Sequence, residues 1–150
     1  MSSIDEESFT RLIKAAVEAK EFAYCRYSKF RVGAALLSKS GNVIKGSNIE
    51  NASYGGTICA ERTALIKAVS EGIREFRALA VTTDVPSVIS PCGMCRQVIR
   101  EFCSLDMPVF LVPGNYLDDG VEKSEKVDIK TMTVGQLLPE SFGPEHLPGA

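Results

Sequence analysis

Two short cysteine-containing segments constrain the fold of this chain more than any other feature of its sequence. Residues 57–62 read TICAER and residues 91–95 read PCGMC. A catalytic zinc site takes three ligands from the protein and leaves the fourth position for water or substrate. We therefore predict that the chain folds so that Cys59, Cys92 and Cys95 meet around one zinc ion, with a helix beginning at each segment.

Two charged residues belong to the first segment. Glu61 lies two positions after Cys59, close enough to carry protons of a water at the metal without binding the metal itself. Arg62 is a candidate hydrogen-bond donor to the thiolates, because three of them bring excess negative charge to a divalent ion. The alternative for Arg62 is an exposed helix arginine. The positive ends of two helix dipoles would also stabilise the thiolates.

A closed zinc site with four protein ligands, which only stabilises the fold, is the alternative to a catalytic site. A fourth ligand at suitable spacing is missing, because Cys25 and Cys103 stand apart and the single histidine, His146, lies near the C-terminus. We interpret Cys103, which follows Cys95 on the same helical stripe, as an inert buried thiol. The odd total of five cysteines favours a reducing compartment over a disulfide framework.

The composition is that of one globular domain over residues 1–150, with 45% apolar and 24% charged residues. The formal net charge of -2 gives no broad positive field that would attract nucleic acid or anionic lipid. No apolar run approaches the roughly 18 residues of a membrane span, and the acidic N-terminus lacks the apolar region of a signal peptide. We therefore expect a cytoplasmic protein.

The spacing of apolar residues predicts an α/β fold with helices on the faces of a sheet. Ser3 and Glu6 form a capping-box pattern before the first helix. Residues 113–126 show no helical stripe, so the last two strands are expected to be antiparallel, because a parallel connection normally needs a covering helix. The expected elements, in order, are a helix over 4–24, strands over 32–37 and 42–49 with a turn at Gly41, a helix from Ala60 to a C-cap at Gly72, a strand over 76–83, a helix over 95–103, strands over 109–112 and 127–132, and a short helix over 133–138 capped by Thr133.

Two further stretches offer groups that could bind a substrate. Residues 24–31 mix basic and aromatic side chains, which either bind single-stranded nucleic acid or anchor a solvated loop to the core, and Phe30 alone could line a pocket. Asn48 and Glu50 stand two apart at the end of a predicted strand and so point to one face. They either grip a pair of vicinal hydroxyl groups or form an ordinary polar strand end.

Five sequence blocks occur in an order that is typical of one enzyme family. They are YSKFRVGAA (27–35), NIENASY (48–54), CAER (59–62), PCGMCRQ (91–97) and LLPESFGP (137–144). A glutamate two residues after the first ligand, followed later by Pro-Cys-x-x-Cys, is the general signature of zinc deaminases. Together the blocks cover nearly the whole chain, which resembles the cytidine deaminases of the small homotetrameric class.

This resemblance implies a three-layer α-β-α sandwich around a five-stranded mixed sheet, one zinc ion per subunit, and hydrolysis of free cytidine and deoxycytidine to uridine and deoxyuridine with release of ammonia. It also implies a homotetramer whose neighbouring subunits complete each active site. Carried over residue by residue, it assigns Cys59, Cys92 and Cys95 as zinc ligands, Glu61 as the proton carrier, Arg62 as a donor to the thiolates, Phe30 as packing on the base, Asn48 and Glu50 as binding the ribose 3′-hydroxyl, the amide of Ala60 as binding the pyrimidine carbonyl, and Ala52, Tyr54 and Phe142 as contributions from neighbouring subunits.

The chain departs from the family pattern at Cys25-Arg26, where Ser-Pro is common, and in residues 114–126, which form a longer loop than usual. Three rival functions remain. Deaminases of polynucleotides or tRNA typically carry a helix between the last two core strands and a basic groove, and this chain has neither pattern. Blasticidin S deaminase is disfavoured by Phe30, Glu50 and the Phe-Gly-Pro tail. A non-enzymatic, zinc-stabilised interaction module predicts stoichiometric metal without turnover.

Overall fold

Five strands form one mixed sheet in the order β2-β1-β3-β4-β5. The computed structural model describes residues 4–116 and 128–149. β3 and β4 are parallel, and the other neighbouring pairs, β4 and β5 included, are antiparallel as predicted. The strands are β1 (Val32–Ser38), β2 (Val43–Ser47), β3 (Phe76–Thr83), β4 (Pro108–Val112) and β5 (Lys130–Thr133).

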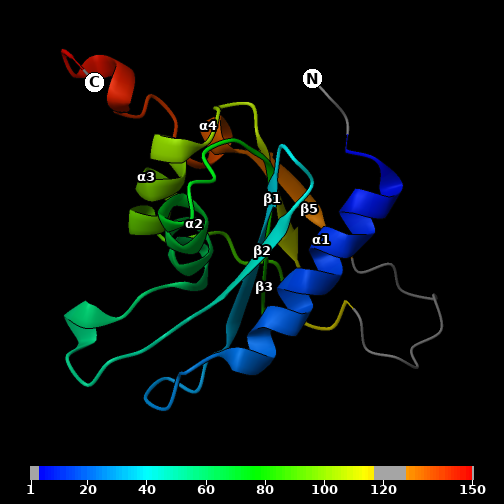
Figure 1. The fold of residues 1–150 in the computed structure, drawn as a ribbon. Coiled ribbons are helices and arrows are strands. Elements are labelled where there is room, and N and C mark those ends of the chain that lie inside the picture. The colour runs from blue at the N-terminus through cyan, green and yellow to red at the C-terminus, as the bar shows by residue number, and fades with distance from the viewer. Residues whose placement is uncertain (1–3, 117–127, 150) are drawn as a thin grey trace.

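Helices cover both faces of this sheet, so the predicted three-layer α-β-α sandwich is confirmed (Figure 1). α1 packs on one face, and α2, α3 and α4 lie on the other face, where α2 contacts α3 and α3 contacts α4. The α-helices are α1 (Glu6–Ala19), α2 (Ala60–Ser70), α3 (Gly93–Phe102) and α4 (Val134–Leu137), and three short 3₁₀ helices are η1 (Lys20–Phe22), η2 (Tyr54–Gly56) and η3 (Pro144–His146).

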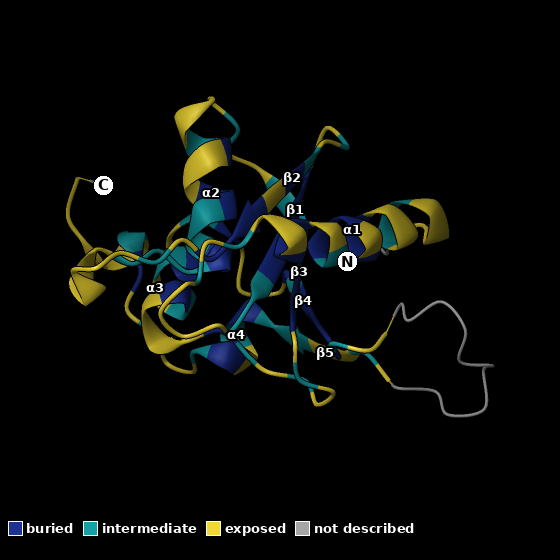
Figure 2. Cartoon of the chain, turned by 90° about the horizontal axis from the view of Figure 1, so that it is seen from below, coloured by how far each residue is buried: buried dark blue, intermediate teal, exposed yellow. Residues whose placement is uncertain are grey.

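Strand alternation divides the core into two clusters, one on each face of the sheet. In β3, Leu79 and Val81 face the α2–α3 layer, whereas Ala78 and Ala80 face α1. Figure 2 shows the buried strands between the two layers of helices. Because successive side chains of a strand point to opposite faces, a continuous apolar run such as residues 78–81 is suited to a central strand.

α1 begins and ends differently from its prediction. Its N-cap is Asp5, whose carboxylate accepts a hydrogen bond from the Ser8 amide at 2.8 Å, and the predicted cap Ser3 lies outside the described residues. The α-helix ends at Ala19 instead of continuing to residue 24, and the chain tightens into η1. There the Lys20 ammonium is buried and donates to the Thr83 carbonyl at 2.8 Å, so a contact with the end of β3 replaces further helical turns.

The hairpin of β1 and β2 forms as predicted, but its second strand is shorter. Gly41 adopts φ +94°, a left-handed conformation that favours glycine in the turn. β2 ends at Ser47, so Asn48 and Glu50 follow the strand and do not share a strand face. Ile49 between them forms isolated β-bridges. The prediction of a strand through residue 49 is therefore wrong, because the chain leaves β1 at this point.

The helix–strand contact beside the cysteines depends on a glycine. A Cβ atom added to Gly46 of β2 would lie 2.5 Å from both the Ala60 carbonyl oxygen and the Ala64 amide nitrogen. The backbone of α2 therefore rests directly on β2, with no side chain between them. At the other end of α2, Glu71 is the C-cap residue, one position before the predicted Gly72, and Gly72 follows it in a left-handed conformation with φ +89°.

The C-terminal elements follow the predicted order. β5 covers residues 130–133 instead of 127–132, and residue 127 lies outside the described residues, as does most of the 114–126 loop. Thr133 caps α4 through a hydrogen bond from the Gln136 amide at 3.1 Å, as predicted. Within the described ranges no helix has the length and apolar character needed to cross a membrane.

Candidate metal centre and active site

The three predicted cysteines lie together at the adjacent ends of two helices. Cys59 is the N-cap residue of α2, Cys92 is the N-cap residue of α3, and Cys95 lies in the first turn of α3. Their sulfur atoms all lie within 4.8 Å of one another, and those of Cys59 and Cys92 are 3.9 Å apart. Sulfurs bound to one tetrahedral zinc ion at its usual bond length would be about 3.8 Å apart, so the cluster fits zinc.

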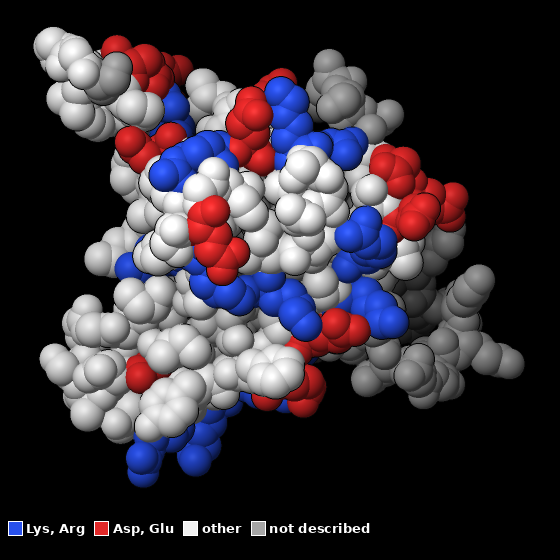
Figure 3. Space-filling model, viewed as in Figure 1, with Lys and Arg blue, Asp and Glu red and all other residues white. Residues whose placement is uncertain are grey.

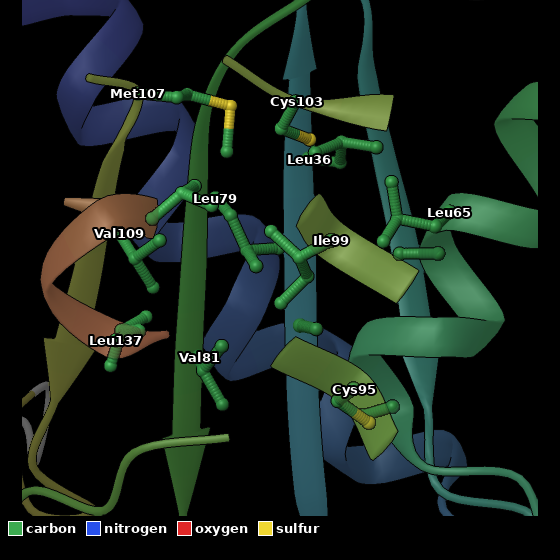
Figure 4. Close-up of a cluster of buried hydrophobic side chains, with 14 of the residues drawn as sticks. Leu36, Leu65, Leu79, Val81, Cys95, Ile99, Cys103, Met107, Val109 and Leu137 are labelled. Carbon is green, nitrogen blue, oxygen red and sulfur yellow. The ribbon is translucent and has the colours of Figure 1, made fainter. Parts of the chain in front are cut away.

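The fold explains why these thiols converge. Both segments enter a helix from a loop, and the two N-cap cysteines have extended backbones and make no side-chain capping hydrogen bond with their own helices. Helix N-termini stabilise negative charge, because backbone N–H groups and the helix dipole point toward them. Cys95 is fully buried and lies at one end of the apolar cluster in Figure 4. The site is therefore continuous with the core on one side, while Cys92 is exposed.

Arg62 binds two of the three sulfurs. Its Nη2 donates to Cys59 Sγ and its Nε donates to Cys95 Sγ, each at 3.4 Å. The pKa of Arg62 lies above its ordinary value, mainly because of the hydrogen bond with Cys59. The structure therefore places Arg62 as a donor to the sulfur cluster and not as a solvent-exposed helix residue.

The thiols affect one another's protonation. The neighbouring Cys95 thiol lowers the pKa of Cys59 to about 5, and the Arg62 guanidinium acts in the same direction. The Cys59 sulfur, together with burial, raises the pKa of Cys95 above its ordinary value. A bound zinc ion deprotonates all the thiols that coordinate it, so the cluster is a set of three anionic ligands when it is metallated.

Glu61 is buried beside these sulfurs in the first turn of α2, with 4% of its surface exposed. Burial raises the pKa of its carboxyl group to about 7, while the neighbouring Cys95 thiol acts in the opposite direction. A carboxylate is rarely left in such a place for stability alone, because desolvation of its charge is costly. Its position next to the cluster suits a group that takes up and releases protons.

Asn48 and Glu50 brace the loop that carries Phe30. Asn48 accepts a hydrogen bond from the Val32 amide at 2.9 Å and donates to the Phe30 carbonyl at 2.7 Å. Glu50 Oε1 accepts from the amides of Tyr27 and Ser28 at 3.0 and 3.1 Å. Sequence reasoning predicted a sugar-binding role for both residues and missed this bracing. Among the described hydrogen bonds, Oε2 of Glu50 is left for a ligand.

The remaining predicted site residues lie in three places. Ala60 is the first residue of α2 and is fully buried. Ala52 and Tyr54 lie in the segment that projects beyond α2, and Phe142 lies in the chain beyond α4 (Figure 1). Tyr54 and Phe142 are 75% and 56% exposed. No hydrogen bond or ring contact within the described part of the chain joins either ring to the sulfur cluster.

A network that sequence reasoning missed ties the Phe30 loop to the ends of β3 and β4. Arg31 donates to the Asp84 carboxylate from its backbone amide, Nε and Nη2, at 2.9 to 3.2 Å. The buried Lys20 donates to the Thr83 carbonyl and forms an ion pair with Asp84 at 3.5 Å. The Arg31 hydrogen bond is the main cause that lowers the pKa of Asp84. No local sequence pattern would have revealed this network, because Asp84 lies more than 50 residues from Lys20 and Arg31 along the chain.

The chain matches known proteins over most of its length. A family model described as "Cytidine and deoxycytidylate deaminase zinc-binding region" matches residues 6–111. The chain is 50% identical over 137 residues to the cytidine deaminase of Sporosarcina psychrophila, covering 91% of this chain and 93% of that protein. It is 49% identical over 145 residues to the probable cytidine deaminase of Dictyostelium discoideum, covering 96% of this chain and 90% of that protein.

The fold has close counterparts among solved structures. The crystal structure of cytidine deaminase from Burkholderia pseudomallei superposes with a TM-score of 0.78 at 42% sequence identity, covering 93% of this chain and all of that chain. That of cytidine deaminase from Mycobacterium tuberculosis superposes with a TM-score of 0.72 at 35% identity, covering 94% of this chain and 99% of that chain. With its five-stranded sheet, its cluster of three cysteines and a family match over most of its length, the chain belongs to the cytidine and deoxycytidylate deaminase family.

Proposed function

We propose that this chain is a zinc-dependent hydrolase that converts free cytidine and deoxycytidine to uridine and deoxyuridine and releases ammonia. The observation that carries the proposal is the set of three sulfurs within 4.8 Å of one another, with the buried carboxyl group of Glu61 beside them. Three ligands from the protein leave one position for water, which is the arrangement of catalytic zinc sites.

Cys59, Cys92 and Cys95 would hold the ion, and Arg62 would keep two of their sulfurs oriented through its hydrogen bonds. When bound, zinc supplies a Lewis acid that lowers the pKa of a coordinated water toward neutrality. The charge that Arg62 withdraws from the thiolates strengthens this effect, because strongly donating thiolates make the metal a weaker acid.

Glu61 moves the protons of the reaction. Its carboxylate takes a proton from the attacking water and passes it to the adjacent ring nitrogen of the pyrimidine, so that the ring carbon bearing the amine becomes electrophilic. It then carries the second proton to the amine, which leaves as ammonia while the carbonyl of uridine forms. One water is consumed and one ammonia is released, so the step balances without a redox partner.

The other site residues would bind and orient the nucleoside. Phe30 packs against the base, and the N–H of Ala60 at the start of α2 binds the pyrimidine carbonyl. Asn48 and Glu50 bind the ribose 3′-hydroxyl in addition to bracing the Phe30 loop. The bracing supports this proposal, because a rigid loop holds the Phe30 ring and the two polar groups in one arrangement before substrate binds.

We further propose that residues 1–150 form one deaminase domain that works as a cytoplasmic homotetramer with shared active sites. Ala52, Tyr54 and Phe142 would each enter the site of a neighbouring subunit. In support, the aromatic rings of Tyr54 and Phe142 are exposed on segments that project from the fold. In Figure 3 the projecting segment at the lower left carries mostly uncharged side chains, which suits an interface.

Charge distribution favours a free nucleoside over a polynucleotide. Figure 3 shows acidic and basic side chains interspersed on the face it presents, without a continuous basic groove on that face. A polynucleotide-binding surface needs clustered cations to neutralise phosphates. The net charge of -2 points the same way.

A substrate panel tests this function. The purified, zinc-loaded protein is incubated separately with cytidine, deoxycytidine, cytidine monophosphate, blasticidin S and a single-stranded oligonucleotide, and ammonia release is followed. We expect turnover of the two nucleosides and at least about a tenfold lower kcat/KM for the others. Faster turnover of blasticidin S or the oligonucleotide would reassign the substrate. Stoichiometric zinc with no turnover of any compound would support an interaction module instead.

A further inference from the structure

A buried arginine of α3 holds the chain beyond α4, which we call the tail (residues 138–149). Arg100 is only 6% exposed. Its Nε donates to Ser141 Oγ at 2.8 Å, and its Nη2 forms an ion pair with the Glu145 carboxylate. A guanidinium buried without such partners would be costly. The tail therefore supplies the hydrogen-bond and charge partners that α3 does not provide for Arg100.

Gly143 allows the tail to pass directly against this guanidinium. A Cβ atom added to Gly143 would overlap the Arg100 guanidinium group. The backbone of Gly143 is extended, with φ -143° and ψ 176°, so any residue could adopt its conformation. Glycine is therefore needed for space and not for conformation, which shows that the contact between tail and arginine is a close fit.

Two more side chains of α3 bind the tail and the end of α4 just before it. Gln97 Nε2 donates to the Phe142 carbonyl at 2.9 Å, and Arg96 Nη1 donates to the Leu137 carbonyl at 2.6 Å. The Phe142 ring stays 56% exposed and stacks on the His146 ring, with centroids 5.5 Å apart. The backbone around Phe142 is thus fixed on α3, while its ring projects without a partner other than His146 among the described residues.

We propose that Arg100 is a positioning residue that fixes the tail through Ser141, Gly143 and Glu145, so that the Phe142 ring projects in the orientation needed to contact a nucleoside in a neighbouring subunit. This inference rests on the proposed function and on the shared sites within it. A tail that is ordered in advance loses less conformational freedom when substrate binds. Arg100 contacts neither the sulfur cluster nor the reacting atoms, so its effect would appear in substrate binding.

The Arg100→Met variant tests the proposal, with hydrogen exchange and steady-state kinetics on the zinc-loaded protein. Met keeps an apolar side chain of similar length but loses both polar contacts. We expect unchanged zinc content, at least about tenfold faster exchange of the hydrogen-bonded amides of Gly143, His146 and Leu147, and a KM for cytidine raised about tenfold with kcat changed less than threefold. Arg100→Lys keeps the charge but cannot form both contacts, so its exchange rates and its KM should lie between those of the wild type and those of Arg100→Met. A purely structural role would lower zinc content or kcat instead.

Gly143→Ala is a second variant that approaches the same contact from the tail and keeps Arg100 intact. It should reproduce the rise in KM and the faster exchange, because the added methyl group displaces the guanidinium. Glu75→Gln is the control for a lost ion pair, since Glu75 and Lys39 are both exposed and pair at 3.2 Å away from the tail. It should leave zinc, exchange and kinetics unchanged.

The outcomes separate this inference from the proposed function. An active wild-type protein whose Arg100→Met and Gly143→Ala variants keep the wild-type KM, or keep slow tail exchange, would overturn the role of Arg100 alone. A wild-type protein that releases no ammonia from cytidine would overturn the proposed function and this inference with it.

Discussion

Arg62 and Cys59 lie one helical turn apart at the start of α2, and the arginine donates from Nη2 to the cysteine sulfur at 3.4 Å. A second hydrogen bond of the same length joins Nε to Cys95, which comes from a different helix. One guanidinium therefore links the two segments that the sequence keeps apart, and it places positive charge beside sulfurs that become anionic on binding a metal. Charge withdrawn from the ligands makes the ion a stronger acid toward water.

Replacement of Arg62 by methionine should weaken both metal binding and catalysis. We expect zinc affinity and kcat each to fall by about 10- to 100-fold, the usual effect of losing a partner of a metal ligand. Zinc affinity is measured by competition with a chromogenic chelator, and kcat by ammonia release. Arg74→Met, an exposed arginine beyond the end of α2, is the matched control. Equal zinc affinity and kcat in the two variants would show that the hydrogen bonds to sulfur are dispensable.

Replacement of Glu61 by glutamine should abolish turnover without removing the metal. The amide keeps the size of the side chain but cannot accept a proton, so kcat should fall by about 10²- to 10⁴-fold or more. Zinc content by atomic absorption should stay at one per subunit. The variant should also be at least as stable as the wild type in urea, because it no longer buries an ionisable group. Residual activity near the wild-type level would remove Glu61 from the role of proton carrier.

Shared active sites can be tested by combining two subunits that carry different defects. A Phe142→Ala subunit contributes Glu61 but not the aromatic ring, and a Glu61→Gln subunit contributes the ring but not the carboxylate. Co-expression of the two should give hybrid oligomers in which about a quarter of the sites combine both intact groups. Activity at low cytidine concentration should then exceed that of either variant alone. Hybrids no more active than a simple mixture of the two purified variants would mean that Phe142 serves its own subunit.

The Asp84 network predicts a pH-dependent stability. Arg31 holds the pKa of Asp84 below its ordinary value of 3.8, so the carboxylate stabilises the folded state at neutral pH, and this contribution is lost as the pH falls below 3.8 through the folded-state pKa. Asp84→Asn should therefore lower the free energy of unfolding by about 1–3 kcal/mol at pH 7, and the difference from wild type should shrink toward pH 3.

Urea unfolding at several pH values between 3 and 7 measures this difference. Glu75→Gln again serves as the control, because exposed ion pairs contribute little. A destabilisation by Asp84→Asn that stayed constant across this range would show that the charge of Asp84 is not what matters. An increase in the KM of Asp84→Asn for cytidine would indicate that the network also positions the Phe30 loop.

The parts of the fold that follow from local pattern were predictable from the sequence. The apolar run of β3, the cysteine segments at two helix starts and the glycines at positions 41 and 72 each determine a structure within a few residues. The end of β2 was not predictable, because it depends on where its antiparallel partner β1 begins. The sequence marked Asn48 and Glu50 as polar groups but could not reveal that they hold the Phe30 loop.

Buried charges were the other failure of prediction. Arg100 and Lys20 are 6% and 5% exposed, and in sequence each reads as an ordinary solvated residue. Their partners lie at least 41 residues away along the chain. Such contacts become visible only when the helices are placed on the sheet. Charged residues on helix positions that should face the core are the one sequence signal that could have revealed them.

The glycine of β2 beneath α2 sets a limit on how this enzyme can be altered. Because backbone touches backbone at Gly46, the spacing between sheet and helix is already at its minimum and cannot be adjusted by choosing a smaller side chain. Redesign of substrate preference therefore has little freedom in the layer that carries Cys59 and Glu61. Under the proposed function, variation would instead enter through the loop around Phe30 and through the tail, which would bind the nucleoside while Cys59 and Glu61 stay in place.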